Sequence, residues 1–425
     1  MKTRMNFWLL ALMICTFVSC ADNANFEPEE QAQEREQLRE KLSHEVTQAE
    51  ARVKLEKMLP NLKLPSTRGG DTNSLPPITS VYTTGKAAVA TRAGEEVEPY
   101  FHIFNFGDNE GFAIMSGDDR VEPLLALTFK GELTSETEID NPGFEIAYSR
   151  MEEYYVQKVS EESLDESSIL PPTIDPIPSP TFGTTVICSP VLCPVKWGQL
   201  DPYNSVICYI REQDSITVGC EAVAIAQLMA VYKYPNSYFY NTATFNWDDM
   251  TNQSPSAEGE GQISILMYLL GNTSNLDMTY ATVLNGGSSS DSDNVHRTLR
   301  NFGYLDGTRC IDYDNDSVMI ELASSYPVLL RGETANRKGH MWLAHGSMRI
   351  VVTPIYPDTY PGIIHQLPMT TDYILCNWGW YGDEDGYYLS GMFYTDYGPR
   401  YPEENITRYH FQNNVEAFIN IRKPY

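Results

Sequence analysis

The chain has 425 residues, of which 42% are hydrophobic and 12% aromatic, so it can build two ordinary hydrophobic cores. Its 57 acidic and 30 basic residues give a formal net charge of −27, which repels phosphate backbones and argues against nucleic acid as a partner. The aromatic content, with 27 Tyr, also excludes a disordered polypeptide.

Residues 1–19 have the features of a targeting signal. Lys2 and Arg4 form a short basic region, and residues 7–18 form an uncharged run too short to span a bilayer. The Phe-Val-Ser-Cys that ends at Cys20 resembles a bacterial lipobox, which implies a lipid on Cys20 and a membrane attachment. We therefore expect an exported cell-envelope lipoprotein, exposed at the surface or released after processing. An ordinary secretory signal cut nearby is the alternative.

Residues 20–158 are predicted to form a first, α+β domain. Its predicted elements are a charged helix over 28–60, two strands over 99–106 and 111–118 joined by a hairpin signal, and a helix over 143–158. Residues 159–185 are rich in Pro, Ser and acidic residues, a composition typical of a linker.

The linker also carries no Lys or Arg, and neither does the chain up to residue 195. A trypsin-like cut would therefore have to fall at Lys158 or Lys196.

Residues 186–425 are predicted to form a second domain rich in Trp, Tyr and Gly. A helix is expected over about 220–232, and strands are expected over 341–352, 373–378, 386–389 and 415–421. No later stretch reaches eighteen apolar residues, so we expect no transmembrane helix.

Cys220 follows a glycine and opens a strongly helix-forming, apolar run. A helix N-terminus offers unpaired N–H groups and a favourable dipole, which lower the pKa of a thiol and favour the nucleophilic thiolate. A small cysteine buried in a core is the alternative for this window alone.

His340 also follows a glycine, at the start of a predicted strand. This placement presents an imidazole at a rim, although a structural role is the commoner one for such a histidine. His345 is a competitor that would lie on the opposite face of a regular strand, and His296 falls in a polar, helix-like segment.

Asn377 ends an apolar strand and is followed by alternating Trp and Gly. Its amide could accept a hydrogen bond from an imidazole and fix the tautomer, and Trp378 would screen that bond from water. An aromatic core strand with a glycine-rich turn is the alternative.

Taken together, Gly-Cys, Gly-His-x-Trp and Asn-Trp-Gly-Trp resemble the streptopain family of papain-like cysteine proteases. Further segments resemble the family as well: Gln-x-x-Pro-Tyr-Asn from Gln199, and those at 229–235, 245–248, 302–304 and, in the propeptide, 111–118.

The resemblance implies a papain-like protease domain behind an inhibitory α+β prodomain, and peptide hydrolysis through a thioester. It implies Cys220 as nucleophile, His340 as base, Asn377 as its orienting partner and Gln199 in the oxyanion hole. Protein or peptide substrates and the chain's own prodomain are the expected partners, cut apart in the linker by the enzyme itself or by a non-tryptic protease.

Four departures from the family pattern concern substrate preference more than chemistry. His345 replaces the family's usual Asp, about a dozen extra residues lie near 354–366, Tyr381 sits in the glycine-rich turn, and Glu221 lies beside the thiol. Two other functions stay open. One is a catalytically silent lipoprotein that binds peptides or host proteins, and the other is a transglutaminase-like enzyme, which ordinarily has Asp as third member.

No cofactor or metal is expected, because the six cysteines outside the signal form no C-x-x-C pair and have no zinc-type His spacing. In an exported protein some of them could form disulfides, for instance Cys188 with Cys193.

Overall fold

The computed structural model describes residues 44–59, 77–85, 98–165, 181–238, 243–285, 287–291, 293–333, 339–355, 368–394 and 415–424. These residues, from His44 onward, belong to one compact unit. The predicted signal, Cys20 and residues 166–180 of the predicted linker lie outside the described residues. None of the described helices is both long enough and apolar enough to cross a membrane.

The first part of the described chain is the predicted prodomain. Its elements are α2 (Gln48–Met58), β1 (Ile78–Thr83), β2 (Phe101–Phe106), the 3-10 helix η2 (Gly107–Asn109), β3 (Phe112–Ser116), β4 (Leu124–Thr128) and α3 (Pro142–Asp165). The predicted hairpin is confirmed, because β2 and β3 pair antiparallel across η2. Gly111 closes this turn with φ +99°, and a Cβ there would meet the Thr128 carbonyl oxygen at 2.3 Å.

The second part carries the helical layer and the remaining strands. Its helices are α4 (Ser205–Arg211), α5 (Cys220–Tyr232), α6 (Trp247–Met250), α7 (Ala257–Gly271), α8 (Asp293–Asn301), α9 (Asn315–Ala323) and the 3-10 helices η4 (Val283–Asn285) and η5 (Ser390–Phe393). Its strands are β5 (Thr181–Cys188), β6 (Arg309–Asp312), β7 (Val328–Glu333), β8 (Gly339–Ile355), β9 (Met369–Asn377), β10 (Gly386–Leu389) and β11 (Glu416–Ile419). The predicted helix and the four predicted strands of this domain are therefore confirmed, with small differences at their ends.

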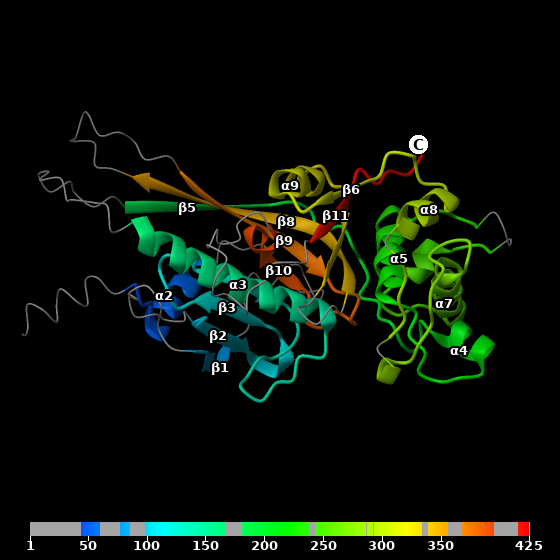
Figure 1. Cartoon of the computed structure of the whole chain (residues 1–425), viewed down its shortest axis with the longest axis horizontal. Coiled ribbons are helices and arrows are strands. Elements are labelled where there is room, and N and C mark those ends of the chain that lie inside the picture. Colours follow the sequence, from blue (N-terminus) through cyan, green and yellow to red (C-terminus); the bar gives the residue numbers. More distant parts are fainter. Residues whose placement is uncertain are drawn as a thin grey trace, which may run out of the picture. The chain divides into compact units, whose positions relative to one another are not determined.

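A single sheet joins the two parts. Its strand order is β1-β2-β3-β4-β10-β9-β8-β7-β11-β6, and β5 pairs with β8 off this path. The junction is the antiparallel pair β4–β10, where Tyr387 faces Leu127. In Figure 1, α3 lies across the strands of the prodomain, while α4, α5, α7 and α8 gather at the other end of the described unit.

The predicted linker boundaries at 159 and 185 differ from the structure. Helix α3 continues to Asp165, because Val159 is buried against the core and Ser160 donates its hydroxyl to the Val156 carbonyl at 2.7 Å. Strand β5 begins at Thr181 because the long strand β8 offers a free edge over residues 348–355, where β5 pairs antiparallel. Only the middle of the predicted linker is left outside the described elements.

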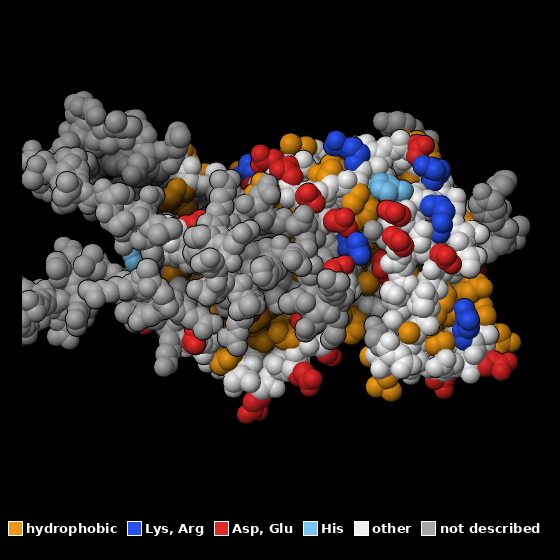
Figure 2. Space-filling model, in the orientation of Figure 1, with side chains coloured by type: hydrophobic (Ala, Val, Ile, Leu, Met, Phe, Trp, Pro, Cys, Tyr) orange, Lys and Arg blue, Asp and Glu red, His pale blue; other side chains and the backbone are white. Residues whose placement is uncertain are grey.

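On the face drawn in Figure 2, acidic and basic side chains lie interspersed over the described surface instead of forming one basic patch.

Candidate active site

Cys220 is the first residue of α5, as the sequence predicts. The chain enters the helix through Gly219, whose φ of +91° suits glycine, and a Cβ there would lie 2.6 Å from the Met278 methyl carbon. Most of α5 is buried, and the helix packs against α7 and β8. The nucleophile candidate is thus held by a rigid, fully packed element.

The thiol of Cys220 is only 8% exposed, and its electrostatic setting differs from the prediction. Burial raises its pKa well above the usual value, and the carboxylate of Glu221 raises it further. The backbone N–H of Met341 acts in the opposite direction but does not reverse the shift. The expectation of a lowered pKa is therefore wrong for this structure, because burial and the Glu221 carboxylate outweigh the backbone N–H groups of Met341 and Glu221.

His340 is the second residue of β8, and it is buried at 2% exposure. Its Nε2 lies 2.8 Å from the carbonyl oxygen of Trp378, so Nε2 carries the proton and donates, since a carbonyl only accepts. Burial lowers the pKa of His340 to about 4, so the imidazole is neutral at neutral pH. A neutral imidazole bonded to a backbone carbonyl does not form an ion pair with the Cys220 thiol.

Asn377 is the last residue of β9, as predicted, but its amide is engaged elsewhere. The Nδ2 group donates to the Val195 carbonyl at 2.8 Å, and Oδ1 accepts from the Gly379 N–H at 3.1 Å. Within the described part of the chain, Asn377 does not make the expected hydrogen bond to His340. The three residues lie at the expected ends of their elements, but their hydrogen-bond partners, which come from other segments of the second domain, were not predicted.

Gln199 lies beside the strand-like segment that leads to the nucleophile. Its backbone carbonyl accepts from the Val218 N–H at 3.1 Å, two residues before Cys220, and the residue is 7% exposed. Among the described residues, its side-chain amide has no hydrogen-bond partner. The neighbouring Leu200 N–H donates to the Tyr381 hydroxyl at 2.8 Å, so Tyr381 ties the glycine-rich turn to this segment.

Trp378 is fully buried, and its indole Nε1 donates to the Glu384 carbonyl at 2.9 Å. The first turn of α3 lies directly against it. A Cβ at Gly143 would meet the Trp378 ring at 2.4 Å and the His340 ring at 2.9 Å. The prodomain therefore contacts both residues of the His340–Trp378 hydrogen bond.

Asn141 fixes this turn of the prodomain, and sequence inspection missed it. Its Nδ2 donates to the Asp383 carbonyl at 3.0 Å and to a Glu384 carboxylate oxygen at 2.9 Å, while its Oδ1 accepts from the Gly143 N–H at 3.1 Å. An Asn two residues before a helical Gly is a capping signal, but nothing in the sequence shows that it reaches the second domain.

Behind Asn377 lies a cavity of about 680 Å³ lined by three buried titratable side chains, Cys193, His345 and Asp385. The His345 Nδ1 accepts from the Cys193 N–H at 3.1 Å, and burial lowers the pKa of His345 to about 3. Asp385 accepts from the Trp378 N–H at 2.9 Å, and burial raises its pKa to about 7. His345 is therefore a neutral structural acceptor, which leaves His340 as the base candidate.

The six described cysteines form no disulfide with one another, so the pairing of Cys188 with Cys193 is not formed. His296, expected in a polar helical segment, is half-buried in α8 and packs against the Phe418 ring at 5.5 Å.

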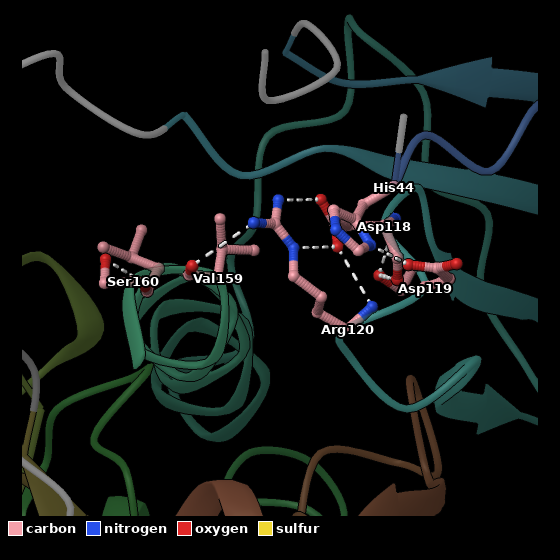
Figure 3. A network of polar contacts seen from close by, with 8 residues as sticks. His44, Asp118, Asp119, Arg120, Val159 and Ser160 are labelled. Carbon is pink, nitrogen blue, oxygen red and sulfur yellow. Dashed lines mark hydrogen bonds and ion pairs between the residues drawn. The ribbon is translucent and has the colours of Figure 1, made fainter. Parts of the chain in front are cut away.

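One cluster of described residues has ligand types that suit a metal: His44, Asp118 and Asp119, whose ligand atoms lie within 4.8 Å of one another. Figure 3 shows why it is an unfavourable cation site. The Asp118 carboxylate is already paired with Arg120 through bonds of 2.6 and 2.8 Å, and His44 is bonded to Asp119 at 2.7 Å. This network ties the start of the described chain to the loop after β3.

Comparison with known proteins agrees with this arrangement. Residues 197–388 match the Peptidase C10 family, and residues 43–159 match the Spi protease inhibitor family, so the two matches span most of the chain. The chain belongs to the Peptidase C10 family. It is a cysteine protease zymogen with a Spi-type prodomain, and the resemblance to the streptopain family is confirmed.

Two curated relatives carry activities in their names. The thiol protease/hemagglutinin PrtT of Porphyromonas gingivalis is 26% identical over 328 residues, which cover 70% of this chain and 35% of PrtT. Streptopain of Streptococcus pyogenes is 24% identical over 342 residues, which cover 69% of this chain and 75% of streptopain. The chain thus spans about a third of PrtT. The hemagglutinin in that name describes PrtT and is not assigned to this chain.

Among solved structures, a prointerpain A fragment of Prevotella intermedia matches with a TM-score of 0.51 and 21% identity. The match covers 78% of this chain and 98% of the fragment. It confirms the fold class: an α+β, papain-like protease domain preceded by an α+β prodomain.

Proposed function

We propose that the chain is an exported cysteine endopeptidase that is latent while its prodomain is docked and that uses Cys220, His340 and Asn377 for catalysis. The observation that carries this proposal is the contact between the nucleophile helix and the strand of the base. The backbone N–H of Met341, the residue after His340, acts as a donor to the Cys220 sulfur.

Release of the prodomain would remove Gly143 from the His340 ring and open the site to water. His340 would exchange the Trp378 carbonyl for the thiol on one side and for the Asn377 amide on the other. The thiol proton would pass to the imidazole, and the thiolate–imidazolium pair would be the reactive form. Its pKa values would return toward ordinary ones because the desolvation that now shifts them is lost.

In the proposed reaction, the Cys220 thiolate attacks the scissile carbonyl, and the Gln199 amide and the Cys220 N–H stabilise the oxyanion. His340 gives its proton to the leaving amine and then activates the water that hydrolyses the thioester. The free side chain of Gln199 supports its role, because an amide without another partner is available for a developing charge.

The test uses the chain from residue 21 onward, incubated under reducing conditions and followed by intact mass. We expect the wild type to shed its prodomain and to bind one epoxysuccinyl inhibitor, and Cys220→Ala to do neither. Cys208→Ala is the matched control, since this half-buried thiol lies in α4 and should leave both events unchanged. A Cys220→Ala chain that still hydrolyses peptides would overturn the assignment, and amine incorporation into a glutamine donor would favour the transglutaminase-like alternative.

Export and lipidation form the second part of the proposal and rest on the sequence around Cys20. Labelled fatty acid should enter the wild-type chain in cells that export it, and Cys20→Ala should abolish the label. An unlabelled wild type that is nevertheless exported would indicate the ordinary secretory signal instead.

A further inference from the structure

Glu221 places a buried carboxylate against the sulfur of Cys220. Its Oε2 accepts a hydrogen bond from the Cys220 thiol at an S···O distance of 3.4 Å, and the residue is 7% exposed. The side chain is in the first turn of α5, where an acidic group interacts favourably with the helix dipole. A structural role at the helix end does not require contact with the reacting atom, because a carboxylate in a first turn can point to solvent.

The groups around Glu221 leave its charge uncompensated. It receives its own backbone N–H and that of Ser290, and among the described residues Arg331 of β7 is a cation that acts on it, with the smallest influence. Arg331 is itself shared by two other acids, Glu333 at 3.5 Å and Glu416 at 3.1 Å. Glu221 forms no ion pair within the described part of the chain, and burial raises the pKa of its carboxyl group.

We propose that Glu221 is a further catalytic residue of this peptidase, whose carboxyl group contacts the Cys220 sulfur and sets the pH range in which the nucleophile is reactive. This inference rests on the proposed role of Cys220 as the nucleophile. It assigns a function to a residue at which the chain departs from the pattern of its family.

The two protonation states of Glu221 act on the sulfur in opposite ways. An ionised carboxylate only accepts hydrogen bonds, so it holds the thiol in its protonated form and repels a thiolate. A neutral carboxyl group carries an O–H that donates to a thiolate and stabilises it. In both states the proton of the thiol goes to His340 when the ion pair forms, and Glu221 keeps the protonation state that it already has. Ionisation of Glu221 therefore opposes ionisation of Cys220, and the nucleophile is favoured on the acidic side of neutrality.

The groups that face this pair are few. Cys220 and Glu221 belong to α5, Arg331 comes from β7, the Met341 N–H comes from β8, and the Ser290 N–H comes from the segment before α8. His340 is bonded to the Trp378 carbonyl, and Glu221 is the charged group with the largest influence on the thiol. After release of the prodomain, His340 becomes its second titrating neighbour.

The experiment measures the rate at which iodoacetamide alkylates Cys220 between pH 5 and pH 9, by peptide mass, in the full chain before and after self-processing. In Glu221→Gln the charge is gone and an amide N–H is available to the thiolate. We expect the alkylation profile to move to lower pH by about one unit or more, and the rate at pH 6 to rise at least about tenfold. The exposed Cys310 serves as a reference thiol in the same sample.

Glu258→Gln is the matched control, because Glu258 lies in the first turn of α7 without contact to a thiol. Its profile should coincide with that of the wild type. A Glu221→Gln profile that coincides with the wild type would overturn the inference. Should Glu221→Gln fold poorly, Glu221→Asp is the second variant, because its shorter side chain withdraws the charge from the sulfur. Its alkylation profile must shift in the same direction, and an unchanged profile would also overturn the inference.

The two proposals fail separately. If Cys220→Ala abolishes peptide hydrolysis while Glu221→Gln leaves the pH profile unchanged, only the role of Glu221 is lost. If the alkylation profile shifts but no variant hydrolyses peptides, the contact between Glu221 and Cys220 stands and the proposed activity falls.

Discussion

The described residues form two hydrophobic cores, and the candidate active site lies between them. One core combines the prodomain with the second domain: β2 to β4 and α3 pack with β8, β9 and β10. The other core is built around α5, α7 and α8 of the second domain and contains no prodomain residue. Strand β8 serves both, because Trp342 faces the first core while Met341 and Leu343 face the second.

This division separates the two halves of the proposed catalytic pair. Cys220 belongs to the helical core, which depends on the second domain alone. His340 is the second residue of β8, and this strand is joined to the prodomain strand β4 through β9 and β10. Gly143 of α3 lies against the His340 ring. The prodomain thus contacts the base candidate through Gly143, whereas the core around the nucleophile helix contains no prodomain residue, and this contrast fits the proposal that latency acts through His340.

Among the substitutions that test this difference between the two cores, Arg120→Met should have the largest effect on stability. The substitution leaves the Asp118 carboxylate buried without its partner, since the two side chains are 3% and 1% exposed. We expect the prodomain to lose about 3–5 kcal/mol of stability. Hydrogen exchange should increase in β2 to β4 and α3 and stay unchanged in α5 and α7.

Arg300→Met is the control for this change, because the Arg300–Asp306 pair is 64% and 79% exposed and should contribute less than about 1 kcal/mol. Equal loss of protection in α5 would break the comparison, since the helical core would then depend on the prodomain.

Gly143→Ala should have the next largest effect. The added methyl group would overlap the Trp378 ring at 2.4 Å and the His340 ring at 2.9 Å, so docking of α3 should weaken by about 1–3 kcal/mol. We expect faster self-processing of the full chain and faster inhibitor labelling of Cys220 before any cut.

Gly261→Ala is the matched helical control, because a Cβ there meets nothing within 4 Å. Wild-type processing and labelling rates in Gly143→Ala would contradict the idea that latency acts through His340.

The smallest expected effect is the pH dependence contributed by Asp385, which holds the Trp378 peptide at the border of the two cores. Burial raises its pKa from 3.8 to about 7, so the folded chain binds a proton that the unfolded chain releases. Its contribution to stability is therefore greatest below about pH 4 and is lost as the pH rises to about 7. Asp385→Asn removes this loss and keeps an acceptor for the Trp378 N–H.

Unfolding of both proteins at several pH values measures the difference. The stability of Asp385→Asn relative to the wild type should grow steadily between pH 4 and pH 7. The lowered pKa values of His340 and His345 make the folded chain less stable as the pH falls. This effect is the same in both proteins, so it cancels in their difference. A difference that does not change with pH would show that Asp385 is not protonated in the folded chain.

Local sequence was sufficient for the elements that carry the chemistry. Apolar periodicity after a glycine predicted α5 from its first residue, because helix formation there depends on neighbours along the chain. The alternating and apolar runs predicted β8 to β11, and Asn377 was correctly expected at a strand end. The order of the three motifs identified the family, since each motif joins a special backbone position to a reactive side chain.

Tertiary structure alone decided the state of the site. The bond from His340 to the Trp378 carbonyl and the high pKa of the Cys220 thiol arise from burial by segments far away in sequence. The extension of α3 to Asp165 likewise depends on a core that the linker composition does not reveal. Desolvation and hydrogen-bond partners are properties of the packed surroundings, so the sequence identified the candidate residues, and only the tertiary structure decided how deeply they are buried and what they bond to.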